Sequence, residues 1–469
     1  MDKRTHITQI SFGQLAKVVS GELYGASSDS CHVRMDNISI DSRSLKPGAL
    51  YIAILGEQYD GHDFVIDALD KGAVGAFVST QWYSRHAEVA RHGIVISVQD
   101  VIIAMQSLAR WHRLQFELPI IAITGSNGKT STKDMTASIL DSRYQVLKTP
   151  GNLNSQVGTP QVLYSLNTTH DMAVFELGMN HPGEMARLAK MTQPTVGVIT
   201  NVGPAHLAYL KSLEGVGRAK GELLENLPPD GWAILNGDDP HVMAQRKRTD
   251  AKVITFGRSM GADVKIKSLT PSLEGSTFEL EDGLVCDLVM PGEHQVLNAL
   301  VAIAVSRLFN IPDETIQSVL GNLQSSAMRL QSVKIGHVHI LDDTYNANPS
   351  STESALKTLA STGKRKIAIL GDMLELGDLS TTAHRAIGQS AGQSADIVLS
   401  VGEHAQEIAE GAIETGIDKA NLFSCKDTHE ATEIIISMIK EGDVILIKGS
   451  RGMKMETIVE AISRSIRSK

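Results

Sequence analysis

A short apolar strand followed by a glycine turn constrains the fold of this chain more than any other feature of its sequence. Residues 120–124 form an apolar run that reads as a buried strand. The run leads through Gly125 and Gly128 into a Lys-Thr pair and a segment with helix character. Backbone N–H groups around such a turn, together with the helix start, form a cradle for polyphosphate. This order of elements favours a phosphate-binding loop over a plain turn that needs glycine.

The residues after the turn supply a charge and a hydroxyl. We expect Lys129 to neutralise charge on the β- and γ-phosphates, and the Thr130 hydroxyl to face a magnesium ion. The turn departs from the common pattern, which has a glycine five residues before Gly128, where this chain has Ile123. The sequence therefore predicts a loop that binds a nucleoside triphosphate and Mg²⁺.

The composition is that of a soluble globular protein long enough for about three domains. The chain has 469 residues, of which 42% are hydrophobic and 21% are charged. Its formal net charge is −9, and it has no long block of basic residues, which argues against non-specific nucleic-acid binding. A nucleotide substrate remains compatible with this charge, because one local basic loop can hold it.

Cysteines and apolar runs predict the cellular compartment. Cys31, Cys286 and Cys425 are far apart and odd in number, so they indicate neither a disulfide framework nor a metal site. We expect structural thiols in a reducing cytosol. The polar first residues lack the apolar core of a signal peptide, and no apolar run approaches the ~18 residues of a membrane span. These features predict a cytoplasmic protein with no membrane span.

Apolar runs alternate with helical patterns along the chain, which is typical of parallel sheets covered by helices. Strands are expected at 50–55, 94–98, 172–177, 196–200, 232–235, 338–341, 366–370, 397–400 and 444–447. Helices are expected at 64–71, 102–118, 294–308, 354–359 and 430–439. The pattern predicts an α/β protein with three domains: a small N-terminal α/β domain (1–116), a central P-loop-type ATPase domain with a parallel sheet (117–330), and a C-terminal Rossmann-like doubly wound domain (331–469).

Three side chains outside the loop are candidates for chemistry. Glu176 ends an apolar strand, where ligands bind in open α/β sheets, and it can bind magnesium beside the phosphate loop. The alternative is a helix-capping or salt-bridged surface glutamate. His206 follows another strand and can ligate a metal, although a lone histidine is more often structural and magnesium prefers oxygen ligands. Lys220, taken alone, reads as a solvated helix lysine.

Two polar loops follow strands in the last third of the chain. Residues 342–349 contain two acids, and an acid in this position can accept hydrogen bonds from ribose hydroxyls. Lys448 and Arg451 follow the last strand and can clamp a carboxylate, with Arg451 able to do so bidentately. Ordinary turn chemistry is the alternative interpretation of both loops.

Taken together, these motifs resemble those of the Mur ligase family. The matching stretches run from residues 41–43 to 448–451, so the resemblance covers nearly the whole chain. The loop with Ile123 in place of glycine fits the family. The stretches 176–180, 345–349 and 370–377 resemble the member of the family that adds D-alanyl-D-alanine.

The resemblance implies one domain each for a UDP-sugar, for ATP and for the incoming dipeptide. It implies catalytic roles for Lys129, Lys220 and His206. Lys220 matches a family lysine that becomes carbamylated, which converts a cation into a carboxylate able to orient a second magnesium. Magnesium ligands are implied at Thr130, Glu176, His206 and carbamylated Lys220.

ATP contacts are implied for Gly125, Ser126, Asn127, Gly128, Lys129, Thr130, Ser131, Asn298, Arg329 and Asp343, the last at the ribose. Substrate contacts are implied for Asp41, Ser42, Arg43, Asn152, Asn154, Ser155, Asn346, Lys448 and Arg451, where Ser155 replaces a frequent family asparagine.

The implied reaction is an ATP-driven amide ligation in cytoplasmic peptidoglycan-precursor synthesis, carried out by a monomer with Mg²⁺. The terminal carboxylate of a UDP-N-acetylmuramoyl-tripeptide attacks the γ-phosphate and gives an acyl phosphate and ADP. The amine of D-alanyl-D-alanine then attacks the carbonyl through a tetrahedral intermediate. Catalysis of phosphoryl transfer is mostly positioning and charge stabilisation, which the loop and the metal would supply.

Three other functions remain open at this point. A sister ligase, such as a diaminopimelate-adding enzyme or folylpolyglutamate synthase, is disfavoured by the sequence of residues 345–349. A P-loop GTPase would need an Asn-Lys-x-Asp guanine motif, which is absent from the sequence, and a kinase would need no amine. A nucleotide-binding module without turnover is disfavoured because the four residues Lys129, Glu176, His206 and Lys220 occur together.

Overall fold

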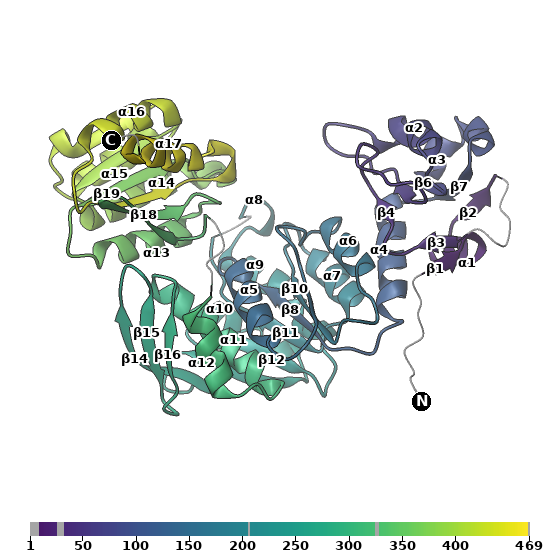
Figure 1. The fold of residues 1–469 in the computed structure, drawn as a ribbon, viewed down its shortest axis with the longest axis horizontal. Helices are drawn as coiled ribbons and strands as arrows, with labels where there is room; N and C mark the ends of the chain where they lie inside the picture. Colours follow the sequence, from purple (N-terminus) through teal and green to yellow (C-terminus); the bar gives the residue numbers. More distant parts are fainter. Residues whose placement is uncertain (1–8, 26–31, 205–206, 324–327, 468–469) are drawn as a thin grey trace. The chain divides into compact units, whose positions relative to one another are not determined.

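The computed structural model describes residues 9–25, 32–204, 207–323 and 328–467, and shows an α/β protein with mostly parallel sheets (Figure 1). The chain forms two compact units. The first contains Met1–Ala122, Tyr144–Met179 and Gly183–Val196, and the second contains Ile123–Arg143, Asn180–Pro182 and Gly197–Lys469. In the part of the chain that the structure describes, no helix is long and apolar enough to cross a membrane. The predicted α/β fold class is confirmed.

A five-stranded sheet forms the core of the N-terminal part. Its order is β2-β7-β6-β5-β4, in which β4 to β7 run parallel and β2 runs antiparallel to β7. A separate antiparallel pair joins β1 and β3. The elements of this part are β1 Gln9–Ser11, α1 Phe12–Val18, β2 Glu22–Tyr24, β3 His32–Arg34, β4 Ile38–Ser39, β5 Leu50–Ile52, α2 Val65–Asp70, β6 Gly75–Ser79, α3 Thr80–Tyr83, β7 Ile94–Val98 and α4 Val101–Arg113.

A nine-stranded sheet with the order β16-β15-β14-β13-β12-β11-β8-β10-β9 follows. Its strands β8, β10 and β11 are buried along their whole length, as continuous apolar runs require. The strands are β8 Ile120–Thr124, β9 Val146–Lys148, β10 Met172–Glu176, β11 Val196–Ile199, β12 Trp232–Asn236, β13 Lys252–Gly257, β14 Val264–Pro271, β15 Ser276–Leu280 and β16 Val285–Leu288. The helices are α5 Lys129–Leu140, α6 Gly158–Tyr164, α7 Glu184–Thr192, α8 Leu207–Leu210, α9 Leu213–Gly221, α10 Pro240–Met243, α11 Glu293–Leu308 and α12 Asp313–Gly321.

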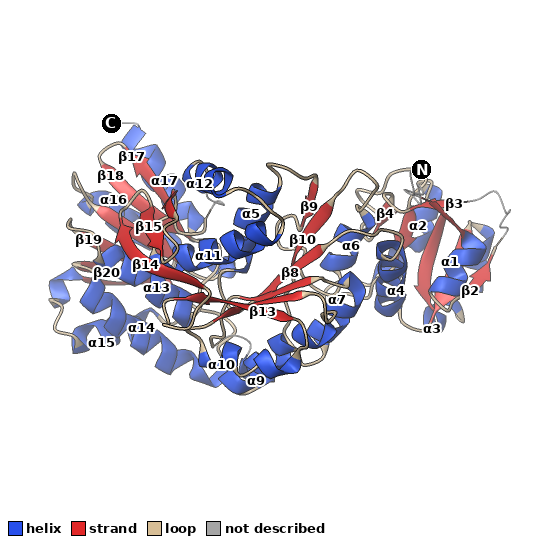
Figure 2. Cartoon of the chain, turned by 90° about the horizontal axis from the view of Figure 1, so that it is seen from below, coloured by secondary structure: helices blue, strands red, loops and turns tan. Residues whose placement is uncertain are grey.

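Helix α11 positions the loop that follows β8. It packs against α5 and against β12, β13 and β14, and its residues from Ala299 to Ser306 are all buried. Figure 2 shows α5, α11 and α12 on one side of β13, and α9 and α10 on the other. The apolar run of 294–308 thus forms a core helix, as the sequence predicts, because almost every face of it contacts other elements.

An antiparallel extension of this sheet was not predicted from the sequence. Strands β14, β15 and β16 pair antiparallel, and the side chains of β15 and β16 alternate between buried and more exposed positions. The turn between β15 and β16 contains Asp282, whose carboxylate accepts from Leu284 N–H at 3.1 Å, and Gly283 with φ of +92°. An Asp-Gly turn between alternating segments is a hairpin signal that a search for buried parallel strands overlooks.

A six-stranded sheet with the order β17-β18-β22-β19-β20-β21 forms the C-terminal part. All neighbours run parallel except the β17–β18 pair. Alternate side chains of β19 separate two cores: Ala368 and Leu370 pack with helices α13, α14 and α15, and Ile367 and Ile369 pack with α16 and α17. The predicted doubly wound arrangement is therefore present. The elements are β17 Gln331–Ile335, β18 Val338–Asp343, α13 Pro349–Ala360, β19 Lys366–Gly371, α14 Ser380–Ser394, β20 Ile397–Val401, α15 Ala405–Glu414, β21 Leu422–Cys425, α16 Thr428–Met438, β22 Val444–Lys448 and α17 Glu456–Arg467.

Two predicted elements are shorter than expected. The strand expected at 50–55 ends at Ile52, and the side chain of Leu55 is exposed. The helix expected at 102–118 ends at Arg113. The guanidinium of Arg113 donates to the carbonyls of Phe116 at 2.6 Å and Leu118 at 3.0 Å, so these groups are bonded outside the helix.

Arg113 links the end of α4 to the segment that leads into β8. Its side chain is buried and also donates to the carbonyl of Thr192 at 2.9 Å. Burial lowers the pKa of the guanidinium to about 10, so it still carries its charge at neutral pH.

We expect Arg113→Leu to reduce stability by about 2 kcal/mol, because one buried and two partly buried hydrogen bonds from a charged donor are lost. Arg110→Leu is the matched control, since Arg110 is exposed in the same helical turn, and should change stability by less than about 0.5 kcal/mol. Thermal and urea unfolding of both variants would measure the difference. Equal stability of the two variants would contradict the proposed role of the Arg113 hydrogen bonds.

Candidate functional site

Two glycines give the loop between β8 and α5 its shape. Gly128, the N-cap of α5, has φ of +79°, and a Cβ there would lie 2.3 Å from Asn298 Oδ1. A Cβ at Gly125 would lie 1.8 Å from Thr200 Oγ1. Both positions therefore exclude a side chain, because neighbouring polar groups occupy the space that it would need.

Residues that follow β11 hold this loop through hydrogen bonds. The backbone N–H of Asn127 donates to Asn201 Oδ1 at 2.9 Å, and the Asn127 carbonyl accepts from Thr200 Oγ1 at 2.6 Å. Ser126 Oγ donates to the Gly203 carbonyl at 3.1 Å and accepts from the Gly203 N–H at 2.8 Å. Hydrogen bonds within the protein thus fix the shape of the loop without a bound ligand.

Sequence reasoning missed Thr200 and Asn201 as parts of the loop's support. The signal that could have found them is their position directly after a buried strand, the same signal that selected Glu176. The hydroxyl of Thr132 also donates to Asn298 Oδ1 at 3.2 Å, which ties α5 to α11.

Lys129 places a positive charge inside the loop. Its Nζ donates to the carbonyls of Gly125 at 2.8 Å and Ser126 at 3.2 Å. The next two residues, Thr130 and Ser131, are buried in the first turn of α5. A helix N-terminus, a fixed glycine turn and a lysine together suit an anionic ligand such as a polyphosphate.

Lys220 lies buried in α9, with only 3% of its surface exposed. Burial holds the pKa of its ammonium well below the ordinary value, and the positive charge of Lys129 lowers it further. The interpretation of Lys220 as a solvated lysine is therefore wrong. A lowered pKa favours the neutral form of the amine, which is its nucleophilic form.

Glu176 ends β10 in the first compact unit, and only 3% of its surface is exposed, which rules out a surface glutamate. Its carboxylate accepts from Asn154 Nδ2 at 2.7 Å, and its backbone N–H donates to Thr149 Oγ1 at 3.0 Å. Asn154 also accepts from Gly178 N–H at 2.9 Å through its carbonyl. The loop of residues 152–155 is thereby attached to the end of β10.

The other members of this loop have more local contacts. Asn152 is exposed, and its carbonyl accepts from the Asn154 N–H at 2.7 Å. Ser155 Oγ accepts from the N–H groups of Val157 at 3.4 Å and Gly158 at 3.1 Å, at the start of α6. The serine in this position therefore accepts hydrogen bonds from the backbone at the start of α6.

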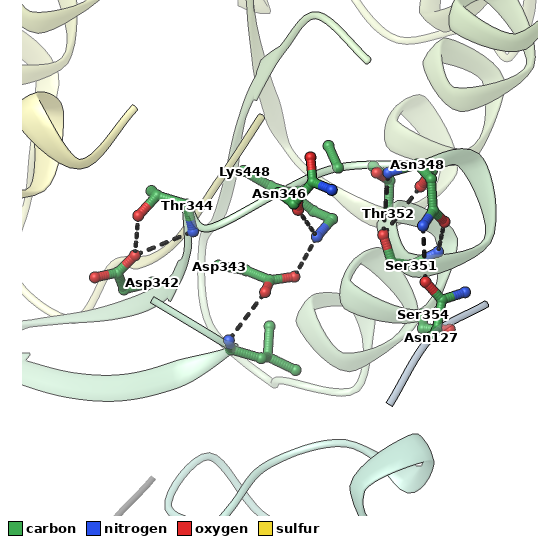
Figure 3. Close-up of polar contacts among 12 residues, drawn as sticks. Asn127, Asp342, Asp343, Thr344, Asn346, Asn348, Ser351, Thr352, Ser354 and Lys448 are labelled. Carbon is green, nitrogen blue, oxygen red and sulfur yellow. Dashed lines mark hydrogen bonds and ion pairs between the residues drawn. The ribbon is translucent and has the colours of Figure 1, made fainter. Parts of the chain in front are cut away.

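A buried ion pair organises the loop after β18 (Figure 3). Lys448 Nζ lies 2.6 Å from Asp343 Oδ2 and donates to the Asn346 carbonyl at 2.9 Å. The other oxygen of Asp343 accepts from Leu330 N–H at 3.0 Å. Lys448 is 2% exposed, so its charge is balanced by Asp343 within the fold.

His294, near the start of α11, is neutral beside this pair. Burial lowers the pKa of its imidazole to about 4, with Asp343 opposing the shift and Lys448 reinforcing it.

The two arginines of the region differ in their surroundings. The Arg329 guanidinium lies 3.9 Å from the centre of the Tyr345 ring, whereas Arg451 is exposed and pairs with Glu456 at 3.0 Å.

The 41–43 segment lies in the first compact unit, after β4. The Arg43 guanidinium donates to both carboxylate oxygens of Asp41, at 2.9 and 2.8 Å, and holds the pKa of that carboxyl at about 2. Ser42 is buried, and its carbonyl accepts from Lys71 Nζ at 3.3 Å. Asp41 is thus a carboxylate at neutral pH.

The second compact unit therefore holds the glycine loop, Lys220, Asn298, Arg329, Asp343, Asn346, Lys448 and Arg451, and the first holds residues 41–43, 152–155 and Glu176. His206 lies outside the described residues. Within the described ranges, no group of three or more His, Cys, Asp or Glu side chains is placed to hold a metal. The candidate magnesium ligands among the described residues are oxygen donors, namely the Thr130 hydroxyl, the Glu176 carboxylate and the carbamate proposed at Lys220.

Comparison with known protein families gives three consecutive matches. Residues 34–113 match the "Mur ligase family, catalytic domain", residues 123–306 the "Mur ligase middle domain", and residues 328–451 the "Mur ligase, glutamate ligase domain".

Curated relatives are similar over their whole length. The UDP-N-acetylmuramoyl-tripeptide–D-alanyl-D-alanine ligase of Escherichia coli K12 is 35% identical over 97% of this chain and 99% of its own. The enzyme of the same name from Bacillus subtilis 168 is 33% identical over 96% and 98%.

Solved structures are similar as well. MurF from Acinetobacter baumannii has a TM-score of 0.89 at 30% identity, covering 99% of this chain and 100% of its own. MurF from Thermotoga maritima in complex with ADP has a TM-score of 0.80 at 26% identity, covering 92% and 99%.

We expect Gly128→Ala to weaken ATP binding about tenfold or more, because the new methyl group would need the space of Asn298 Oδ1 and the backbone would be strained. Isothermal titration with a non-hydrolysable ATP analogue would measure this loss. Gly261→Ala is the matched control, since a Cβ there meets nothing within 4 Å and its φ is not positive. Unchanged affinity in Gly128→Ala would show that this turn does not hold the nucleotide.

Proposed function

Because this chain belongs to the Mur ligase family, we infer that it joins D-alanyl-D-alanine to a UDP-N-acetylmuramoyl-tripeptide in a reaction driven by ATP. It is an ATP-dependent ligase that forms a C–N bond and releases ADP and phosphate, in the synthesis of peptidoglycan precursors. The observation that carries this conclusion is the identity of 35% to a ligase of that name over 97% of the chain. The rigid glycine loop with Lys129 supplies the phosphate cradle that the reaction needs.

We propose three functional domains at 1–116, 117–330 and 331–469, for the UDP-sugar, ATP and the dipeptide. Family matches at 34–113, 123–306 and 328–451 support these boundaries. The two soluble nucleotide substrates support a cytoplasmic location, and we propose a monomer as the active form.

ATP binding is proposed for Gly125 to Ser131 and for three residues contributed by other elements: Asn298, Arg329 and Asp343. Asn298 supports this role because it contacts Gly128 and Thr132 directly. The Tyr345 ring fixes the Arg329 guanidinium, and Asp343 has a carboxylate available to a ribose hydroxyl through lone pairs beyond those that Leu330 and Lys448 use.

Magnesium is proposed at Thr130, Glu176, His206 and Lys220. Hydroxyl and carboxylate oxygens are the ligands that Mg²⁺ prefers, and an ammonium cannot ligate it. In its neutral form, which burial favours, the amine of Lys220 can add to CO₂, losing one proton and forming a carbamate that supplies oxygen ligands. When bound, Mg²⁺ would neutralise charge on the phosphates and the attacking carboxylate.

The substrates are proposed to contact the remaining residues. Asp41, Ser42 and Arg43 would bind the uridine nucleotide, and the 152–155 loop would bind the sugar-peptide. Asn346, Lys448 and Arg451 would bind the dipeptide. Both cations pair with an acid, but Lys448 is buried against Asp343 whereas Arg451 is exposed beside Glu456, so Arg451 is the better candidate for the dipeptide carboxylate.

The reaction then proceeds in two steps. The terminal carboxylate of the tripeptide attacks the γ-phosphorus, the bond to the β-phosphate oxygen breaks, and an acyl phosphate and ADP form. The dipeptide amine attacks the acyl carbon, and the tetrahedral intermediate expels phosphate and loses a proton. Lys129 stabilises the migrating phosphoryl group, and the fixed loop keeps that charge in place.

An acceptor series tests the function. With the UDP-tripeptide and ATP present, we expect D-alanyl-D-alanine to increase ADP release together with formation of the amide, whereas single amino acids such as diaminopimelate or glutamate should not. Release of ADP with a single amino acid and none with the dipeptide would favour a sister ligase instead. Mass spectrometry of the nucleotide-peptide product distinguishes these outcomes.

A lysine substitution tests the carbamate. We expect Lys220→Ala to lose activity by at least about a hundredfold and to regain part of it with acetate or formate, since a short carboxylate can replace the carbamate. Lys220→Arg keeps a cation and should be inactive without rescue. Lys211→Ala, at a nearby exposed lysine, is the control.

A direct spectroscopic measurement complements the rescue. Wild-type protein in ¹³C-bicarbonate should show a carbamate resonance that Lys220→Ala lacks. Full activity of Lys220→Ala, or the same resonance in the variant, would contradict the assignment.

A further inference from the structure

One hydrogen bond joins the glycine loop to the loop that follows β18. Asn348 Nδ2 donates to Asn127 Oδ1 at 2.7 Å, across 221 residues of sequence (Figure 3). Both residues lie in the second compact unit. Asn127 belongs to the loop proposed to hold ATP, and Asn348 precedes the first helix of the part proposed to bring the dipeptide.

The helix that follows fixes the orientation of the Asn348 amide. Asn348 is the N-cap of α13, and its Oδ1 accepts from the N–H of Ser351 at 2.9 Å. Ser351 Oγ accepts in return from the Asn348 N–H at 3.2 Å. Because the cap uses Oδ1, the NH₂ group of Asn348 must point towards Asn127.

The position of Asn127, which accepts this hydrogen bond, is also fixed. The backbone of Asn127 is held by Thr200 and Asn201, so its side chain leaves the loop in one direction. Gly203 lies between the two loops, since a Cβ there would be 3.6 Å from the Cβ atoms of both Ser126 and Ser350. The contact is therefore part of a close packing of the two loops rather than a single exposed bond.

We propose that Asn348 is a positioning residue that sets the dipeptide-binding part against the ATP loop, so that the amine reaches the acyl phosphate before water does. This inference rests on the proposed function. An acyl phosphate that waits for a misaligned amine is hydrolysed, which consumes ATP without forming an amide. The ratio of amide formed to ADP released therefore reports the alignment.

Asn348→Ser is the decisive variant. Serine is as good an N-cap as asparagine but is too short to reach Asn127. At saturating ATP, UDP-tripeptide and D-alanyl-D-alanine, we expect the ratio of amide to ADP to fall about threefold to tenfold, the range that corresponds to one neutral hydrogen bond. Asn127→Ala leaves α13 intact and should cause the same fall.

Ser351→Ala is the matched control, because it removes the reciprocal half of the capping box and keeps the Asn348–Asn127 bond. It should destabilise α13 and leave the ratio of amide to ADP unchanged. In the double variant of Asn127→Ala and Asn348→Ser, the ratio should be no lower than in either single variant, since both remove the same contact.

Three results would overturn the inference. They are an unchanged ratio in Asn348→Ser or in Asn127→Ala, an equal fall in Ser351→Ala, and additive losses in the double variant. Failure of the proposed function is distinguishable, because the wild-type enzyme itself would then form no amide from the dipeptide.

Discussion

The close approach of two glycines to polar groups from other strands and helices is the constraint on which the nucleotide loop depends. Gly125 leaves room only for the Thr200 hydroxyl, and Gly128 leaves room only for the Asn298 amide. These neighbours bond to the loop backbone or to α5, so the shape of the loop is set by β11 and α11 as much as by its own residues. A loop preorganised in this way loses little conformational entropy when it binds a phosphate chain.

Two buried lysines show how the fold uses one side-chain type for two purposes. Lys448 and Lys220 are 2% and 3% exposed. Lys448 contacts the Asp343 carboxylate, and the pair orders the loop after β18. Burial lowers the pKa of Lys220, and the positive charge of Lys129 lowers it further, so the neutral amine is favoured. Burial beside an opposite charge thus keeps a lysine paired, whereas burial near a like charge favours its neutral form.

Much of the fold could be predicted from the sequence because its strands are buried on both faces. Runs such as β10 and β22 are almost entirely apolar, and their positions were predicted to within a residue or two. The hairpin strands β15 and β16 alternate instead, since one of their faces is exposed, and they were missed. The end of α4 was also missed, because it depends on where the Arg113 side chain finds its acceptors.

The sequence by itself determined the chemical groups and their order: a strand, a glycine turn, a lysine and a threonine, followed by acids and lysines at the ends of later strands. Only the tertiary structure decided which of these groups meet. The contacts of Asn127 with Asn201 and Asn348 join residues 74 and 221 positions apart. The contact of Lys448 with Asp343 likewise joins residues 105 positions apart. Such contacts arise from the packing of whole strands and helices, and a local pattern carries no information about that packing.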